Sequence, residues 1–179
     1  MTRKALMTIA MTSLCSTALT VAAMAQDYTV GIIQYVDHAS LNQITDSIVA
    51  ELEAKSAEGE DTYSVVFQNG QADQSSLIQI TAQMLSEADV IIPIATPAVF
   101  PVQEQTAEQA DDERIPVVFS AVSDPVSAGL VDSMDAPGAN ITGTSDALNT
   151  GAILDLMFVA DPTIEFVGLL HDKSQDSSA

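Results

Sequence analysis

Polar side chains that could contact a ligand follow three uncharged, strand-like segments of this sequence. The segments are Val30–Ile33, Val90–Ala95 and Ile115–Phe119. The polar residues that follow them are Asp37, Thr96, Ser120 and Asp124. In open α/β sheets, ligands bind outside the carboxyl ends of the strands. A carboxylate at such an edge could bind an ammonium group, and hydroxyls beside helix N–H groups could bind an anion.

Each of these residues also has an interpretation that involves no ligand. Thr96 and Asp124 both precede a proline, and a capping residue followed by Pro is typical of a helix start, so both are predicted to cap helices. Asp37 could bind a ligand ammonium group or cap its own loop. Tyr35 could stack on a ligand or lie at the edge of the core. His38 is interpreted as an exposed loop histidine, with contact to a site as the alternative.

No catalytic motif accompanies these residues. The sequence contains no G-x-x-x-x-G-K-[ST] phosphate loop, no G-x-G-x-x-G dinucleotide fingerprint and no G-x-S-x-G nucleophile motif. Its two histidines, His38 and His171, lack the spacing of a zinc site. The acidic residues around 108–113 lack the ligand spacing of a calcium loop. We therefore expect a binding protein rather than an enzyme, with no catalytic residue, no metal and no cofactor.

The positions of the polar residues depend on a predicted alternation of strands and helices. Strands are expected at Tyr28–Tyr35, Tyr63–Phe67, Val90–Ala95, Ile115–Ala121, Ile141–Thr144 and Phe166–Leu170. Helices are expected to begin at a capping box of Ser40 and Gln43, after Asp73, at Pro97 and at Ala152. Helix-length connections between strands indicate parallel pairing with right-handed crossovers. The predicted fold is therefore α/β, with an open, doubly wound parallel sheet.

The N-terminal segment has the pattern of a secretory signal peptide. A basic start, Met1–Lys4, precedes the apolar segment Ala5–Ala22, and Ala23-Met24-Ala25 matches a small-residue cleavage site. Cleavage is expected after Ala25, which would release the chain into the periplasm without membrane insertion; an uncleaved membrane helix is the alternative. Cys15 is the only cysteine and lies in this segment, so no disulfide or thiol chemistry is expected.

The sequence after Ala25 is strongly acidic. It contains all 25 acidic residues, whereas the whole chain has five basic residues and a net charge of −20. Binding to nucleic acid or to an anionic membrane needs Lys and Arg, so neither partner is expected. The acidic residues are scattered, which indicates a solvated surface whose self-repulsion a salt-rich habitat would screen. The length suffices for one domain and falls short of two full ones.

Five segments come in the order found in one family of proteins. They are VGIIQYVDHASL (Val30–Leu41), QNGQADQ (Gln68–Gln74), IATPA (Ile94–Ala98), PVVFSAVSDPVSAGLV (Pro116–Val131) and GANITGTSD (Gly138–Asp146). Through them the chain resembles the substrate-binding proteins of ABC transporters of the tryptophan/tyrosine-type uptake group. The resemblance implies a type I periplasmic binding protein, in which two α/β lobes close on a small zwitterionic ligand, typically an amino acid. The ligand would then be delivered to a membrane permease.

The resemblance also implies which residues contact the ligand. In chain order they are Tyr35, Asp37, Thr96, Pro97, Ser120, Ala121, Asp124 and Asp146. Hydroxyls and helix N–H groups would bind the ligand carboxylate. Asp37 or Asp146 would bind the ammonium group, and Tyr35 would contact the ligand side chain.

The chain departs from the family pattern in three ways. Ser127 stands where the family usually has Gly, and Asn149 stands where Pro is common. Family members also continue after the strand that matches Phe166–Leu170 into a complete second lobe and then return to the first. We therefore expect residues 26–145 to form the N-terminal lobe. Residues 146–179 would form the crossover and the first helix and strand of an incomplete second lobe, and this truncation would impair ligand binding.

Two other classes of function remain open from the sequence. One is a secreted single-domain α/β enzyme with an unrecognised site, which turnover of a substrate without any permease would support. The other is a sensor or interaction module that uses the open lobe to dock a partner protein, which a stoichiometric co-purifying partner would support.

Overall fold

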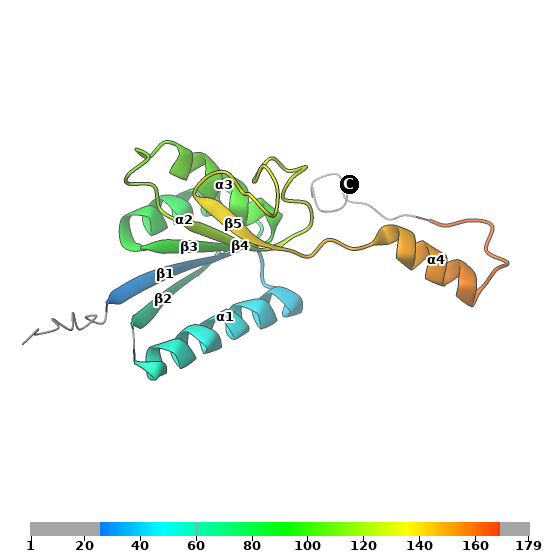
Figure 1. Cartoon of the computed structure of the whole chain (residues 1–179), viewed down its shortest axis with the longest axis horizontal. Helices are drawn as coiled ribbons and strands as arrows, with labels where there is room; N and C mark the ends of the chain where they lie inside the picture. The colour runs from blue at the N-terminus through cyan, green and yellow to red at the C-terminus, as the bar shows by residue number, and fades with distance from the viewer. Residues whose placement is uncertain (1–25, 60, 169–179) are drawn as a thin grey trace, which may run out of the picture.

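The structure, a computed structural model, describes residues 26–59 and 61–168, in which strands and helices alternate (Figure 1). The strands are β1 (Asp27–Gln34), β2 (Thr62–Asn69), β3 (Val90–Ile94), β4 (Val117–Val122) and β5 (Ile141–Ser145). The helices are α1 (Ala39–Glu58), α2 (Gln74–Glu87), α3 (Thr96–Ala107) and α4 (Thr150–Ala160). The predicted elements through α4 are thus present with shifted ends, except for the helix expected after Asp124. The expected signal peptide lies outside the described residues.

The described strands form one parallel sheet in the order β2-β1-β3-β4-β5. On one side of β1, Asp27 is opposite Thr62 of β2; on the other, Val30 is opposite Val90 of β3. The order reverses at β1 because the chain first moves outward to β2 and then crosses back over β1 to β3. Such a reversal leaves a crevice at the carboxyl ends of the neighbouring strands. The predicted open, doubly wound sheet is confirmed.

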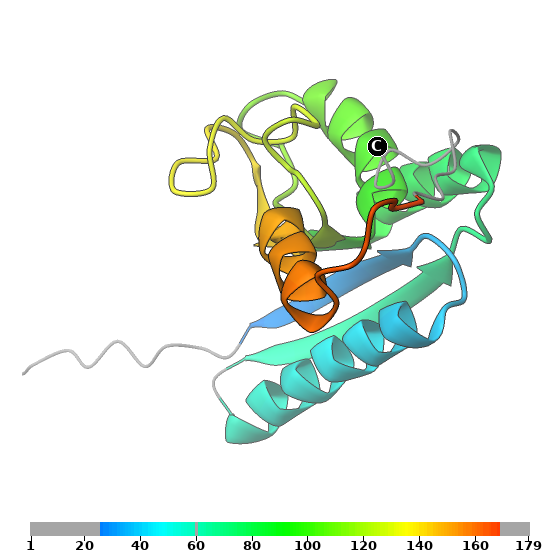
Figure 2. The same cartoon turned by 90° about the vertical axis from the view of Figure 1, so that its right-hand side faces the viewer.

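Helices cover both faces of this sheet, with α1 on one face and α2 and α3 on the other (Figures 1 and 2). The apolar side chains of α1 pack on a core that contains the fully buried Ile32 of β1. On the opposite face, Leu77 of α2 and Val99 of α3 are fully buried in a core with Ile33. Full burial of such a side chain contributes about 1.5–3 kcal/mol, so the two cores hold the strand ends in fixed positions.

The start of α1 differs from the prediction. The predicted capping box of Ser40 with Gln43 is wrong, because α1 begins at Ala39 and His38 is its N-cap. The Nδ1 atom of His38 accepts a hydrogen bond from the Ser40 N–H at 3.3 Å. The chain enters the helix earlier than predicted, and Ser40 therefore supplies a capped N–H instead of the capping oxygen.

Other helix boundaries follow from local residue types. Helix α1 ends at Gly59, whose φ of 88° suits glycine. The predicted cap of α2 is confirmed, because the Asp73 carboxylate accepts a hydrogen bond from the Ser76 N–H at 2.7 Å. Asp124 likewise accepts from the Ser127 N–H at 2.9 Å. The chain forms only a hydrogen-bonded turn after Asp124, rather than the predicted helix.

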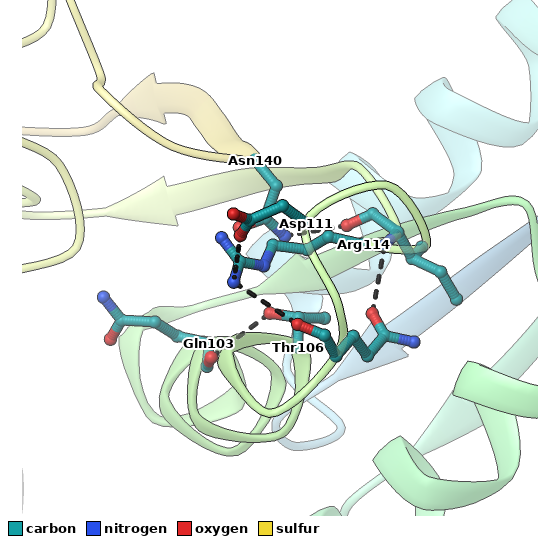
Figure 3. Close-up of polar contacts among 7 residues, drawn as sticks. Gln103, Thr106, Asp111, Arg114 and Asn140 are labelled. Carbon is teal, nitrogen blue, oxygen red and sulfur yellow. Dashed lines mark hydrogen bonds and ion pairs between the residues drawn. The ribbon is translucent and has the colours of Figure 1, made fainter.

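Arg114 lies in the loop that precedes β4, at the amino-terminal edge of the parallel sheet. Its guanidinium contacts Asp111 Oδ1 at 2.9 Å and the Gln109 carbonyl at 3.4 Å, beside the end of α3 (Figure 3). Asn140 donates from Nδ2 to the Ile115 carbonyl at 2.8 Å, which ties the start of β5 to the start of β4. The arginine therefore stabilises the edge of the sheet opposite to the carboxyl ends of the strands.

The segment after β5 extends away from the sheet. In Figure 1, α4 lies beyond the end of the sheet, and none of its residues is buried. Its exposed apolar side chains include Leu156 at 70% and Val159 at 79%. The strand predicted at Phe166–Leu170 is wrong for its described part, because residues 166–168 form no strand and Phe166 is 90% exposed. Strand formation needs a neighbouring strand, and none lies beside residues 166–168 in the described part of the chain.

Candidate functional site

A cavity of about 400 Å³ lies at the carboxyl ends of β1, β3, β4 and β5, which are neighbours in the sheet. Its lining residues come from these strand ends and the segments that follow: Tyr35, Val36, His38, Leu41, Ala95, Thr96, Pro97, Ala121, Ser123 and Asp146. The cavity spans the point between β1 and β3 where the strand order reverses. This is the position at which open α/β sheets bind ligands.

A buried polar network fixes the loop between β1 and α1. Gln34, the last residue of β1, is 1% exposed, and its Nε2 atom donates to the Val36 carbonyl and to Asn42 Oδ1, both at 2.7 Å. Its Oε1 atom accepts from the Thr45 hydroxyl at 2.6 Å. Asn42 donates in turn to Asp37 Oδ1 at 2.7 Å. Because a fully bonded buried network holds one geometry, these contacts set the path of the first cavity-lining loop.

His38 lies where this loop turns into α1, and it lines the cavity. Its ring caps the helix through the Ser40 N–H, and its backbone carbonyl accepts from the Asn42 N–H at 2.8 Å. The residue is exposed, as predicted for a loop histidine. The structure adds that the exposed ring is at the cavity and is oriented by the helix that it caps.

The loop after β3 contains a backbone turn with unusual geometry. Ala95 has a φ of 75° and a ψ of 147°, a region that favours glycine. Its N–H donates to the Ser120 carbonyl at 3.0 Å, so pairing with β4 continues to this residue. The prediction that Thr96 caps α3 is wrong: Thr96 is the first helical residue, and no side chain caps the helix. Backbone N–H groups and a partial positive charge are therefore left at the start of α3.

The ends of β4 and β5 form the remaining side of the cavity. Ala121 is a second cavity-lining alanine with a positive φ, 55°, at a place where the pairing of β4 with β5 is irregular. The Ser145 hydroxyl donates to the Ser123 carbonyl at 3.0 Å, and the Asp146 N–H donates to the Val122 carbonyl at 3.1 Å. Strained backbone of this kind concentrates at functional sites, because the surrounding structure must be built to hold it.

The charge of the cavity comes from one side chain and from helix ends. Among the described residues that line it, Asp146 carries the one carboxylate, and neither Lys nor Arg is present. Arg114 lies at the opposite edge of the sheet. Partial positive charge in the cavity therefore comes from the N-termini of α1 and α3. A carboxylate and helix N-termini on one cavity suit a small ligand that carries both an ammonium and a carboxylate group.

Five of the eight residues predicted to contact a ligand line this cavity, namely Tyr35, Thr96, Pro97, Ala121 and Asp146. The other three do not. Asp37 lines a separate hollow of about 510 Å³. Ser120 is half-buried in β4, where its carbonyl accepts from the Ala95 N–H. Asp124 is bonded to the Ser127 N–H, which lowers the pKa of its carboxyl group below the ordinary value.

The structure also brings residues to the cavity that the sequence did not single out as ligand contacts: Val36, Leu41, Ala95 and Ser123. Leu41 was expected only in the apolar face of α1, and it packs in that core as well as lining the cavity. The positive φ of Ala95 carries no sequence signal, because alanine normally avoids this region. Ser123 could have been found from its place between Ser120 and Asp124, since that whole segment ends a strand.

The lining groups can bind and orient a ligand by hydrogen bonds and apolar contact. Hydroxyl groups are available from Tyr35, Thr96 and Ser123, and apolar surface from Leu41 and Pro97. Within residues 26–59 and 61–168, no group of three or more His, Cys, Asp or Glu side chains is placed to hold a metal ion. In the same part of the chain, no helix has both the length and the apolar character needed to cross a membrane.

Comparison with known proteins supports a common origin with solute-binding proteins. A family model described as ABC transporter substrate binding protein matches residues 29–179. A tyrosine-binding protein from Clostridioides difficile (strain R20291) is 35% identical over 150 residues, which cover 83% of this chain and 42% of the relative.

Solved structures extend this likeness to the fold. An ABC domain from Streptococcus pneumoniae in complex with L-Trp has a TM-score of 0.73 and 31% identity, over 85% of this chain and 50% of that one. A ligand-free, open substrate-binding protein with adhesive properties from Clostridium difficile has a TM-score of 0.64 and 32% identity, over 84% and 50%. The chain therefore spans half the length of these relatives or less. It has the type I periplasmic binding protein fold and belongs to the family of ABC transporter substrate-binding proteins.

Proposed function

We propose that this chain is the extracytoplasmic solute-binding component of an ABC uptake transporter and that its ligand is an aromatic amino acid. The observation that carries the proposal is the cavity at the strand ends, where the uncapped start of α3 and the Asp146 carboxylate line the same space. These groups complement the two charges of an amino acid. Relatives named for tyrosine binding and solved with L-Trp support the aromatic class.

Each part of the ligand has a counterpart in the cavity. The ligand carboxylate binds at the start of α3, where the Thr96 N–H and hydroxyl are available. The ammonium group pairs with Asp146, and the side chain lies against Tyr35, Leu41 and Pro97. A carboxylate bound by N–H groups needs no basic side chain, which fits the absence of Lys and Arg among the described lining residues.

The predicted ligand residues outside the cavity lining have supporting roles. Ser120 holds Ala95 in place through its carbonyl, and Asp37 is tied to Asn42 in the network that sets the β1–α1 loop. Asp124 fixes the turn after β4 through the Ser127 N–H. We infer that these three residues position the lining residues, while the cavity residues contact the ligand.

The ligand is held between two lobes, and the cavity at the strand ends is the N-terminal lobe's side of that cleft. Residues 26–145 form this lobe, and α4 belongs to the second one, which accounts for the absence of buried residues on α4. Cleavage after Ala25 places the protein in the periplasm, where a membrane permease is its partner. Uptake of labelled L-Trp by cells with that permease should then depend on this chain.

Calorimetric titration of the purified, folded chain with L-Trp, L-Tyr and L-Phe tests the ligand proposal. Saturable binding of one of them is expected. Tryptamine, which lacks the carboxylate, and indole-3-propionate, which lacks the ammonium group, test the two charged contacts separately. A folded chain that binds none of the three amino acids would refute the proposal.

The variant Asp146→Asn tests the ammonium contact. Loss of a charge-assisted hydrogen bond costs about 1.5–3 kcal/mol, so affinity for the amino acid should fall about 10- to 100-fold. Affinity for indole-3-propionate should not fall. The matched control is Asp112→Asn, an equal change of charge at an exposed residue between α3 and β4, which should leave affinity unchanged.

A further inference from the structure

His38 is the cavity residue whose chemistry is least explained by the fold. It caps α1, yet Ser, Thr, Asp and Asn are the residues that cap helices best. The cap that it forms is long, 3.3 Å from the Ser40 N–H to Nδ1. A poor capping residue at a position that also lines the cavity indicates that the ring is there for a second reason.

The cap determines where the ring carries its proton. A neutral imidazole has one N–H donor and one acceptor nitrogen. Because Nδ1 accepts from the Ser40 N–H, the proton lies on Nε2, and Nε2 is a hydrogen-bond donor. Among the described residues, the Ser40 N–H is the ring's one hydrogen-bond partner, so the Nε2 donor is left for a ligand.

The surroundings of His38 identify the ligand group that it suits. The ring lies at the N-terminus of α1, and the N-terminus of α3 lines the same cavity. Both helix ends favour a negative group. Asp146 lines the same cavity and is an acceptor, but no hydrogen bond joins it to His38.

From these observations we propose that the Nε2–H of His38 donates a hydrogen bond to the carboxylate of the bound amino acid, and that the α1 cap holds the ring in the donor tautomer. This inference rests on the proposed amino-acid ligand. It gives that ligand carboxylate two anchors, the start of α3 and a neutral ring whose donor atom is chosen by the backbone of α1.

Nuclear magnetic resonance tests the tautomer without any ligand. The chain has two histidines, so His171→Gln assigns the His38 ring by removing the other set of signals. The nitrogen shifts of His38 at neutral pH should show the proton on Nε2. A proton on Nδ1 would overturn the inference, because Nδ1 could not then accept from the Ser40 N–H.

Calorimetry of His38→Ser tests the contact itself. Serine restores a good helix cap and is too short to replace the ring, so the melting temperature should hold or rise while affinity for the amino acid falls about tenfold. Affinity for tryptamine, which lacks the carboxylate, should stay within twofold. The matched control is Asp73→Ser, a cap exchange on α2 at a residue that does not line the cavity, which should leave both affinities unchanged.

The outcomes separate this inference from the proposed function. A wild-type chain that binds no amino acid refutes the proposed function, and the His38 contact with it. A wild-type chain that binds an amino acid, with His38→Ser binding equally well, refutes only the contact. An equal loss of affinity for the amino acid and for tryptamine also refutes it, because the effect would then not depend on the carboxylate.

Discussion

Ala95→Gly is expected to stabilise this protein, although alanine-to-glycine exchange normally does the opposite. Ala95 has a φ of 75° and a ψ of 147°, in a region that glycine occupies freely and alanine does not. The conformation is held by the hydrogen bond from its N–H to the Ser120 carbonyl at 3.0 Å and by the start of α3 at the next residue. Glycine would keep these contacts and release the strain.

The net effect follows from three terms of different sign. Backbone strain of this kind costs about 1–3 kcal/mol, which the glycine variant recovers. Glycine adds freedom to the unfolded chain, which costs about 0.4–1 kcal/mol. The lost methyl group is half-buried, and full burial of such a group contributes about 0.8 kcal/mol, so about half of that is lost. With mid-range values of about 2, 0.7 and 0.4 kcal/mol for these terms, the variant should be more stable by roughly 1 kcal/mol.

Urea unfolding followed by circular dichroism measures this difference. At a mid-range slope of about 2 kcal/mol per M, the midpoint should rise by about 0.5 M without a change of slope. The matched control is Ala98→Gly, the same chemical change three residues later at a fully buried position within α3. There glycine should destabilise by about 2 kcal/mol, from helix propensity and the lost methyl group.

The two variants must differ in sign for the reasoning to hold. If Ala95→Gly lowers the midpoint as Ala98→Gly does, the turn at Ala95 is not strained in solution, and its geometry cannot be taken as a device that presents the start of α3. A stabilised Ala95→Gly that binds the amino acid several-fold more weakly would show that the strain is kept because it fixes the ligand-binding N–H groups.

Three further results are expected. Gln34→Leu should lower the free energy of unfolding in urea by about 2–3 kcal/mol, because it leaves the buried Thr45 hydroxyl and other groups of the network unpaired. The double variant Gln34→Leu with Thr45→Val should recover part of that loss. Equal stability of Gln34→Leu and wild type would contradict a stabilising role for the network. Hydrogen bonds, chiefly from Ser76, Ser127 and Thr163, lower the pKa values of Asp73, Asp124 and Asp161 respectively, so the stability that these carboxylates contribute is present above the unfolded pKa of 3.8 and is lost as pH falls through the lower folded pKa values. In acid titrations of stability, the variant with all three residues changed to Asn should therefore lose less stability than wild type over this pH range. Parallel stability curves for the two proteins would contradict this prediction. The melting temperature should rise between 0.05 and 1 M NaCl, because the acidic residues of a chain with a net charge of −20 repel one another and salt screens this repulsion. A constant or falling melting temperature would show that repulsion between the acidic residues does not destabilise the fold.

The centre of the sheet could be predicted from sequence because β1, β3 and β4 contain short, mainly apolar segments, although the ends of the strands shifted. β1 and β3 pack against helices on both faces, so most of their residues are apolar, whereas β4 is buried mainly on one face and its Val118 is 38% exposed. The strand expected at Phe166–Leu170 has the same composition and is not formed in its described part. Composition indicates that a segment is suitable for burial, whereas a strand also needs a neighbouring strand, and none lies beside residues 166–168 in the described part of the chain.

The helix starts show why the details of the site were harder to predict. Thr96 has the residue type of a cap, but the position of the cap is decided by the bond between the Ala95 N–H and the Ser120 carbonyl, which joins two strands far apart in sequence. His38 does not have the residue type of a cap and forms one. Gln34 interrupts an apolar strand, and its role is visible only when Asn42 and Thr45 from the next helix are brought beside it.

These features together show how the proposed ligand carboxylate could be bound by so acidic a chain. Long-range repulsion from a net charge of −20 is spread over the surface and weakened by salt, whereas helix N–H groups act within the first turn of the helix. The one arginine of the described chain is committed to Asp111 at the far edge of the sheet. In the proposed complex, the start of α3, presented by the strained Ala95, would bind the carboxylate, so no basic side chain would be needed and the surface could stay acidic. Asp146, the one carboxylate among the described lining residues, would then pair with the ammonium group at the opposite end of the proposed ligand.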